Sequence, residues 1–283
     1  MIKVLFVSDM HGRIAWYEKL FSAIESEKPN LVLLGGDLLP HALLRSEAHP
    51  HFIKDFLHHG FLKLQKTLNS NYPKIFLIMG NDDPRFLEED LISAGSNGLW
   101  TYLSNKVVPY AGYSLCGYSF VPPTPFQLKD WERYDVSRFV DPGCISPEQG
   151  KHSIPTEPDI LRYSTIQKDL TKFFASEDAS KLVCLFHSPP YQTNLDRAAL
   201  DGRMVDHAPL DVNIGSIAIR KFIENTQPLL TLHGHVHESS RITGHWQDTI
   251  DQTQMFSAAY EGPQLAVIKF NLENPKQAER LLL

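Results

Sequence analysis

Five short apolar segments, each followed by Asp, Asn or His, constrain the fold of this 283-residue chain more than any other feature. A short segment that is apolar throughout is typical of a strand buried on both faces, as in a parallel sheet. Stretches with apolar residues at helical spacing separate several of these strands, and this alternation predicts an α/β architecture. The five expected strands are residues 2–7, 31–34, 74–79, 182–186 and 229–232.

Further elements are expected in the rest of the chain. Residues 121–158 are rich in Pro and Gly, which predicts a long ordered loop. Loops of this length in compact domains are usually functional, and both a lid over a site and a dimer contact are open. The sequence shows no internal repeat, and its length fits one large domain or two smaller ones, of which we expect a single domain over residues 1–283. The other expected elements are helices over 14–28, 49–68, 159–174 and 214–225, a hairpin over 107–120, and closing strands over 253–259 and 264–270.

The polar residues at the strand ends are expected to converge, because ligands of open α/β sheets bind beyond the carboxyl ends of the strands. They comprise two carboxylates, one amide and four imidazoles, a donor set suited to Mn, Fe, Zn, Co or Ni. Seven ligands are too many for one catalytic ion with an open position, whereas two ions that share a carboxylate leave room for water and substrate. The seven residues are Asp9, His11, Asp37, Asn81, His187, His235 and His237.

Each of these residues, taken alone, has a simpler explanation. Asp9 is a favoured helix N-cap, Asp37 suits a turn beside two glycines, and His187 alone would more often be a structural histidine. Independent turns, however, have no reason to place metal-ligand types in this order at the ends of these five strands. The joint pattern therefore favours a dinuclear metal site.

The motifs around these residues resemble a known family. The blocks are Asp9-Met10-His11, Gly36-Asp37, Gly80-Asn81-Asp82, His187 and Gly234-His235-Val236-His237. In this order they are similar to the five blocks of the calcineurin-like metallophosphoesterase superfamily. Softer similarities, such as Pro122-Pro123-Thr124-Pro125-Phe126 and Asp130-Trp131-Glu132, resemble the Icc-like phosphoesterases within it.

This resemblance implies a fold, a metal centre and an activity. The fold is a four-layer αββα sandwich of two mixed β-sheets flanked by helices. The activity is hydrolysis of a phosphodiester or a small phosphomonoester by a metal-bridging hydroxide, with Asn81 steadying the phosphoryl oxygens. Two divalent ions are implied, with Mn²⁺ expected first and Fe, Zn, Ni or Co as alternatives. By position, the resemblance assigns Asp9, His11 and His237 to the first ion, Asn81, His187 and His235 to the second, and Asp37 to both.

One position departs from the family pattern. Many members carry His after the Asn of the third block, whereas this chain carries Asp82. A carboxylic acid is mostly ionised near neutral pH, and nearby cations lower its pKa further. We therefore expect Asp82, assigned here to a catalytic position, to protonate a leaving group weakly, which favours aryl phosphodiesters; His41 is a weaker candidate acid. Asp83 is expected beside the site, where it holds a donor in place.

Composition excludes some functions. The chain carries 27 basic and 33 acidic side chains, a net charge of −6, which argues against a nucleic-acid coat and favours a small phosphoester substrate. No apolar run reaches the length of a membrane span, and three scattered cysteines suit a reduced cytoplasm. A homo-oligomer stays open. The alternative functions are a catalytically silent scaffold that binds a partner protein and, last, a hydrolase of carboxylic esters or amides.

Overall fold

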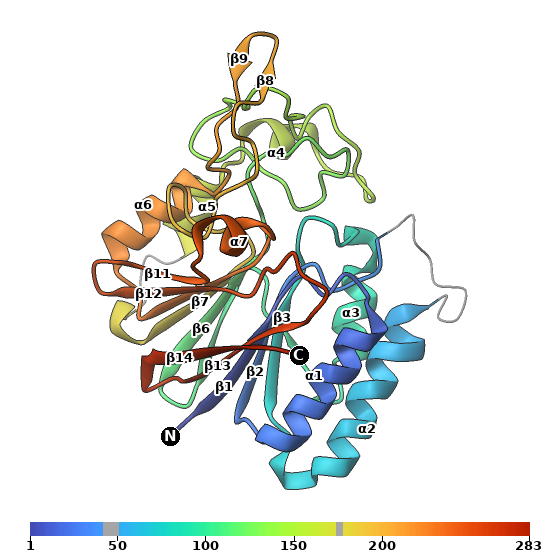
Figure 1. The fold of residues 1–283 in the computed structure, drawn as a ribbon. Coiled ribbons are helices and arrows are strands. Elements are labelled where there is room, and N and C mark those ends of the chain that lie inside the picture. The colour runs from blue at the N-terminus through green and yellow to red at the C-terminus, as the bar shows by residue number, and fades with distance from the viewer. Residues whose placement is uncertain (42–50, 174–177) are drawn as a thin grey trace.

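The computed structural model describes residues 1–41, 51–173 and 178–283. Two six-stranded mixed sheets pack face to face, and helices cover the outer face of each sheet (Figure 1). This is the expected αββα sandwich. No helix within the described ranges has the length and apolar character that crossing a membrane requires.

The first sheet has the strand order β14-β13-β1-β2-β3-β4. Its strands β1 to β4 run parallel, and β13 and β14 are added antiparallel at one edge. Helices α1, α2 and α3 lie on its outer side (Figure 1). The bounds are β1 Lys3–Val7, β2 Leu31–Gly35, β3 Lys74–Ile78, β4 Thr101–Tyr102, β13 Ala266–Asn271, β14 Asn274–Leu282, α1 Ile14–Glu27, α2 His59–Leu68 and α3 Glu88–Ala94.

The second sheet has the order β11-β12-β10-β7-β6-β5. Its four central strands are parallel, and its two edge strands are antiparallel to their neighbours. Helices α5 and α6 cover its outer face (Figure 1). The bounds are β5 Lys106–Tyr110, β6 Tyr113–Tyr118, β7 Leu182–Phe186, β10 Leu230–His233, β11 Gln247–Ile250, β12 Thr253–Ser257, α5 Ile166–Phe173 and α6 Ile217–Thr226.

The central strands are apolar on both faces because each face is buried. Phe6, Leu33 and Leu185 belong to the cluster between the two sheets, and each is at most 1% exposed. Their strand neighbours Leu5 and Leu34 point the other way, into the cluster beneath the helices. The unbroken apolar runs of the sequence therefore correspond to the double burial expected of such strands.

Two irregular segments lie beyond the sheets, above the carboxyl ends of the parallel strands (Figure 1). The first is residues 121–158, which contain only isolated β-bridges, as expected for a long ordered loop; it leads into α4, Pro158–Tyr163. The second, residues 188–216, contains a short hairpin of β8, Met204–Val205, and β9, Ala208–Pro209. A further short helix, α7, spans Ser239–Thr243.

The five buried strands, the hairpin and both closing strands are confirmed, with differences at several other elements. The helix predicted over 159–174 is two helices, because the backbone at Ser164 is extended. The helix predicted from residue 214 begins at Ile217, where Ser216 Oγ accepts a hydrogen bond from the Ile219 amide. The predicted start at residue 49 lies outside the described residues, and from residue 53 a π-helical turn, Ile53–His58, precedes α2. The sequence prediction omitted α3, α7, β4, β8, β9, β11 and β14.

The inter-sheet cluster generates a stability prediction. Replacing Phe6, which is fully buried, by Ala should lower the free energy of unfolding by about 3 to 5 kcal/mol through lost burial and a cavity. Urea denaturation would measure the change. The matched control is Phe139→Ala, because that ring is 69% exposed, and its effect should stay within about 0.5 kcal/mol. Equal effects of the two substitutions would contradict the proposed packing.

Candidate metal centre

The carboxyl ends of β1, β2, β3, β7 and β10 meet at one edge of the sandwich. Backbone hydrogen bonds connect the loops that follow them. The Asp9 amide donates to the Gly36 carbonyl at 2.9 Å, and the His11 amide donates to the Asp37 carbonyl at 2.8 Å. Within the second sheet, the Gly234 amide donates to the His187 carbonyl at 2.9 Å, and the His235 amide reaches across to the first sheet, where it donates to Asp9 Oδ1 at 3.0 Å. Through this last bond, residues 226 positions apart share one site.

Two motif glycines allow this close approach. Gly36 has a φ of +95°, and a Cβ atom there would lie 2.7 Å from His187 Nδ1. A Cβ atom on Gly80 would lie 2.6 Å from His187 Nε2 and would collide with the Asp37 carboxylate. Any larger residue would displace the two side chains, so glycine is required by space at both positions.

Asp9, His11 and His237 form the first group of side chains. One carboxylate oxygen of Asp9, Oδ1, lies 3.1 Å from His237 Nε2. The Nε2 atoms of His11 and His237 lie 3.3 Å apart. Ser8 Oγ donates a hydrogen bond to the other oxygen of Asp9, which fixes the carboxylate. Nothing in the sequence distinguishes Ser8 from an ordinary strand-end residue, so its contribution could not be predicted.

Asp37, Asn81 and His187 form the second group. His187 Nε2 lies 3.3 Å from Asp37 Oδ2 and 3.1 Å from Asn81 Oδ1. His187 Nδ1 lies 2.8 Å from the Gly35 carbonyl, which orients the ring and aims Nε2 at the other two side chains. Asp9 also reaches this group, since donor atoms of Asp9, Asp37 and His187 lie within 4.8 Å of one another.

These separations fit metal ligation. Two N or O atoms bound to one ion at tetrahedral or octahedral angles lie about 2.8 to 3.6 Å apart. The four separations given above, from Asp9–His237 to His187–Asn81, are 3.1 to 3.3 Å. The metal-free site thus holds carboxylate, amide and imidazole atoms at separations compatible with an ion between them, and this donor set suits divalent metals.

His235 lies at the edge of this arrangement. Its amide donates to Asp9 Oδ1 at 3.0 Å, and its ring packs edge-on against His187, with 5.4 Å between the ring centroids. Within the described residues it belongs to none of the groups of three or more donors that approach within 4.8 Å. Burial lowers the pKa of His235 to about 3, so its ring is neutral and keeps a lone pair for a metal.

The ionisation of the metal-free site is set by its carboxylates. Burial opposes the charge of Asp9 and Asp37, but hydrogen bonds and the charge of neighbouring histidines outweigh it and lower both pKa values. Burial alone would lower the pKa of His187, yet the Asp37 and Asp9 carboxylates raise it to about 10. Without metal, a proton on His187 therefore balances part of the carboxylate charge.

Asp82 and Asp83 differ in role although they are adjacent. The Asp82 amide donates to Asp37 Oδ1 at 2.8 Å, and its carboxylate lies 3.7 Å from His11 Nδ1, within a third group of donors made with Asp37 and His11. In the metal-free protein the pKa of Asp82 is raised, mainly by burial and secondly by the negative charge of Asp37. Bound cations are expected to have the opposite effect and to lower this pKa. His41 is exposed, and its electrostatic interaction with Asp82 lowers the pKa of that carboxyl.

Asp83 is fully buried and connects two loops. Its carboxylate accepts hydrogen bonds from the amides of Leu38, Leu39 and Gly80 at 2.7 to 3.0 Å. Asp83 was predicted to hold a donor in place, and the groups it binds are backbone amides. It thereby connects the loop after β2 to the loop after β3.

His233 shows how a histidine in the same motif can be structural. Its Nδ1 lies 2.9 Å from the Ser188 carbonyl and its Nε2 lies 2.7 Å from Thr231 Oγ1. Both ring nitrogens are therefore engaged by the protein. Burial lowers its pKa to about 3. His233 was not among the predicted ligands, and its hydrogen bonds give it a structural role.

Comparison with solved structures supports the fold. One structure, 16% identical, superposes with a TM-score of 0.61 and covers 99% of this chain and 98% of its own. TT1561 of Thermus thermophilus is 13% identical, with a TM-score of 0.58 and the same coverage of both chains. A dimetal phosphatase from Danio rerio is 10% identical, with a TM-score of 0.51, and the alignment covers 94% of this chain and 92% of that one.

The sequence comparisons give the family. No curated protein matches the chain. The family model for calcineurin-like phosphoesterases matches residues 2–239, which include every predicted ligand. The match spans most of the chain and agrees with the order of the five motif blocks, and the protein therefore belongs to the calcineurin-like phosphoesterase family.

Proposed function

We propose that the protein is a phosphoric ester hydrolase with a dinuclear metal centre, and that it prefers small phosphodiesters. The convergence of carboxylate, amide and imidazole atoms at metal-ligand spacing carries this proposal. Family membership supports the hydrolase class. The Danio rerio structure of the same fold is described as a dimetal phosphatase, which agrees with a two-ion site.

The chain's own residues would hold the ions in two overlapping sets. In this proposal the ions are Mn²⁺; when bound, a pair of divalent ions supplies a hydroxide nucleophile at neutral pH and neutralises phosphoryl oxygens. Asn81 lies at the end of β3 with its amide directed toward His187, where it can also contact a phosphoryl oxygen. The proposed ligands are Asp9, His11 and His237 for one ion, Asn81, His187 and His235 for the other, and Asp37 between them.

Asp82 supports the preference for diesters with good leaving groups. Its side chain is 27% exposed and lies beside His11 and Asp37, so it can meet a leaving group at the mouth of the site. As a carboxylic acid it holds a proton less firmly than an imidazolium does, and bound cations would weaken that hold further. Esters whose leaving groups need little protonation, such as aryl phosphodiesters, are therefore the proposed substrates.

The first test compares the wild type with Asp37→Asn. Both proteins are stripped of metal, reloaded with Mn²⁺ and assayed on a bis-aryl phosphodiester and an aryl phosphomonoester. The wild type should hydrolyse the diester faster, and the variant should lose at least about a hundredfold in kcat, because the shared carboxylate is gone. Asp201→Asn, whose side chain is 70% exposed in an ion pair with Arg197, is the matched control and should retain full activity.

The outcomes separate the candidate functions. Two bound equivalents of Mn²⁺ without turnover of either ester would favour the silent scaffold. A faster reaction with the monoester would overturn the diester preference. Absence of Mn²⁺ binding would contradict the metal centre itself.

Metal binding should release a proton near neutral pH. His187, with a pKa of about 10 in the metal-free protein, must lose its proton to become a ligand. The apparent affinity for Mn²⁺ should therefore increase with pH, by up to about tenfold per unit below that pKa. Titration calorimetry between pH 6.5 and 8.5, in two buffers of different ionisation enthalpy, would count the released protons. The exposed His207→Gln control should behave as the wild type, and an affinity independent of pH would refute the assignment of His187.

The role of Asp82 can be tested with leaving groups of different pKa. Asp82→Ala should lower kcat/KM for an alkyl phosphodiester about tenfold more than for an aryl phosphodiester, because only the alkyl leaving group needs a proton. His41→Gln, tested in parallel, should affect both esters equally. Equal losses for both esters in Asp82→Ala would show that Asp82 does not protonate the leaving group.

A further inference from the structure

We propose that Asp130 is a positioning residue for the catalytic loop, so that residues 121–158 serve as a brace for the site. The loop in question is residues 80–86, which includes the proposed ligand Asn81 and the adjacent Asp82. This inference rests on the proposed function, because the brace matters for catalysis only if the loop holds ligands.

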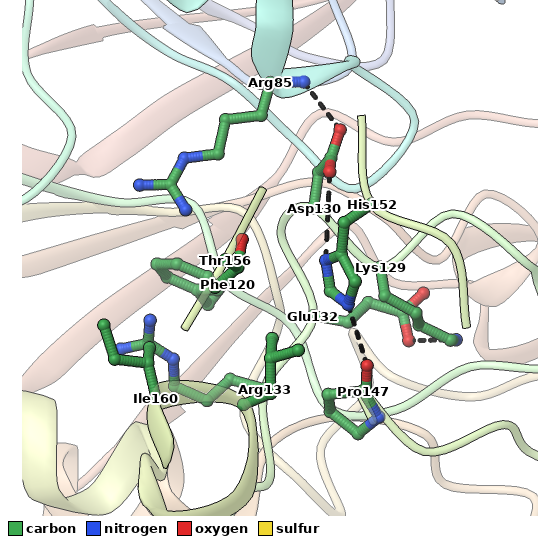
Figure 2. A pocket seen from close by; sticks show the side chains of 11 residues that line it. Arg85, Phe120, Lys129, Asp130, Glu132, Arg133, Pro147, His152, Thr156 and Ile160 are labelled. Carbon is green, nitrogen blue, oxygen red and sulfur yellow. Dashed lines mark hydrogen bonds and ion pairs between the residues drawn. The ribbon is translucent and has the colours of Figure 1, made fainter. Parts of the chain in front are cut away.

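Direct hydrogen bonds connect Asp130 with this loop. Asp130 Oδ2 accepts from the Arg85 amide at 2.7 Å and from Ser153 Oγ at 2.5 Å, while Oδ1 accepts from the Ser153 amide at 2.7 Å. Ser153 Oγ in turn accepts from the Phe86 amide at 3.0 Å. Two residues of the irregular segment thus engage two successive amides of the loop. Figure 2 shows the contact between Asp130 and Arg85.

A side-chain contact reinforces the same junction. The Arg85 guanidinium lies over the ring of Trp131, 5.1 Å from its centroid, within the range of a cation–π interaction. Trp131 is fully buried and packs edge-on against Phe120, which follows β6. The brace is therefore anchored in the second sheet and reaches the loop of the first.

The Asp130 carboxylate is suited to this role. Its side chain has no exposed surface, and it accepts three hydrogen bonds from amides and a hydroxyl. His152 Nδ1 lies 4.0 Å from it, and His152 Nε2 lies 2.8 Å from the Pro147 carbonyl (Figure 2). Hydrogen bonds to a buried carboxylate are stronger than those to neutral acceptors, so the junction resists displacement.

The loop is then fixed on both sides of its functional residues. Asp83 accepts the Gly80 amide at one end, and Asp130 accepts the Arg85 amide at the other. Pro84, which directly precedes Arg85, has no amide hydrogen, so the Arg85 amide is the first backbone donor after Asp83. Asn81 and Asp82 are held between these two fixed points. Loss of either point would let them move relative to Asp37, and displacements of about 1 Å can reduce a rate about a hundredfold.

The test compares Asp130→Asn with Glu132→Gln. Glu132 is buried two residues away, but it bonds Lys129 and Thr124 within the segment and no described residue of the catalytic loop. Asp130→Asn should lower kcat for an aryl phosphodiester at least about tenfold with KM nearly unchanged, and should weaken the binding of one of the two Mn²⁺ ions about tenfold. Glu132→Gln should change neither by more than about twofold, although both variants are expected to lower the melting temperature.

A metal-independent measurement accompanies the assay. Amide hydrogen exchange of the metal-free protein should become at least about tenfold faster at Arg85 and Phe86 in Asp130→Asn and not in Glu132→Gln. If Asp130→Asn does not fold, Ser153→Ala is the substitute, since it removes the acceptor of the Phe86 amide and one donor to Asp130. Its expected losses are at least about threefold.

The results separate the two proposals. Parallel losses in both carboxylate variants, or an unchanged kcat in Asp130→Asn, would overturn the positioning role. A wild type that neither binds Mn²⁺ nor hydrolyses the ester would refute the proposed function. In that case hydrogen exchange decides alone: selective acceleration at Arg85 and Phe86 supports the brace, and equal rates in both variants overturn it.

Discussion

The burial of like charges at one sheet edge is the constraint on which the rest of the structure depends. Asp9 and Asp37 are each at most 3% exposed and lie in one donor cluster with His187. Buried carboxylates this close repel one another unless positive charge lies between them. The fold supplies part of it through a proton on His187, and a divalent ion at the same point would replace that proton with more charge. Metal binding and the stability of this edge are therefore expected to be coupled.

A second set of buried carboxylates organises the chain where regular structure ends. Asp83, Asp130 and Asp196 each accept at least two backbone amides from outside the sheets and helices described above. Loops that carry no sheet or helix bonds must satisfy their buried amides in some other way. A carboxylate can accept several at once, and this accounts for the ordered path of residues 121–158 and 188–216 above the site.

The parts of the structure that were predictable are those governed by local pattern. Apolar runs such as 182–186 are buried on both faces, and the polar residues that follow them converge because parallel strands end at a common edge. By contrast, β14 carries exposed charged residues such as Lys276 and Glu279 without an alternating pattern, and it pairs with the edge that β13 offers. The contribution of Ser8 and the contact between Asp130 and Arg85 depend on distances across the fold, which no spacing in the sequence encodes.

The acid beside Asn81 also affects which ester the site can attract. Asp82 adds a third carboxylate to a cluster that already includes Asp9 and Asp37, and it lies 3.7 Å from His11. Each added negative charge offsets part of the charge that two divalent ions would bring. A phosphomonoester dianion gains from every uncompensated positive charge, whereas a phosphodiester carries a single negative charge and needs fewer. If the proposed function holds, a cluster with Asp82 in place of an imidazole would favour the diester twice, through weak protonation of the leaving group and through the lower positive charge that it leaves for the substrate.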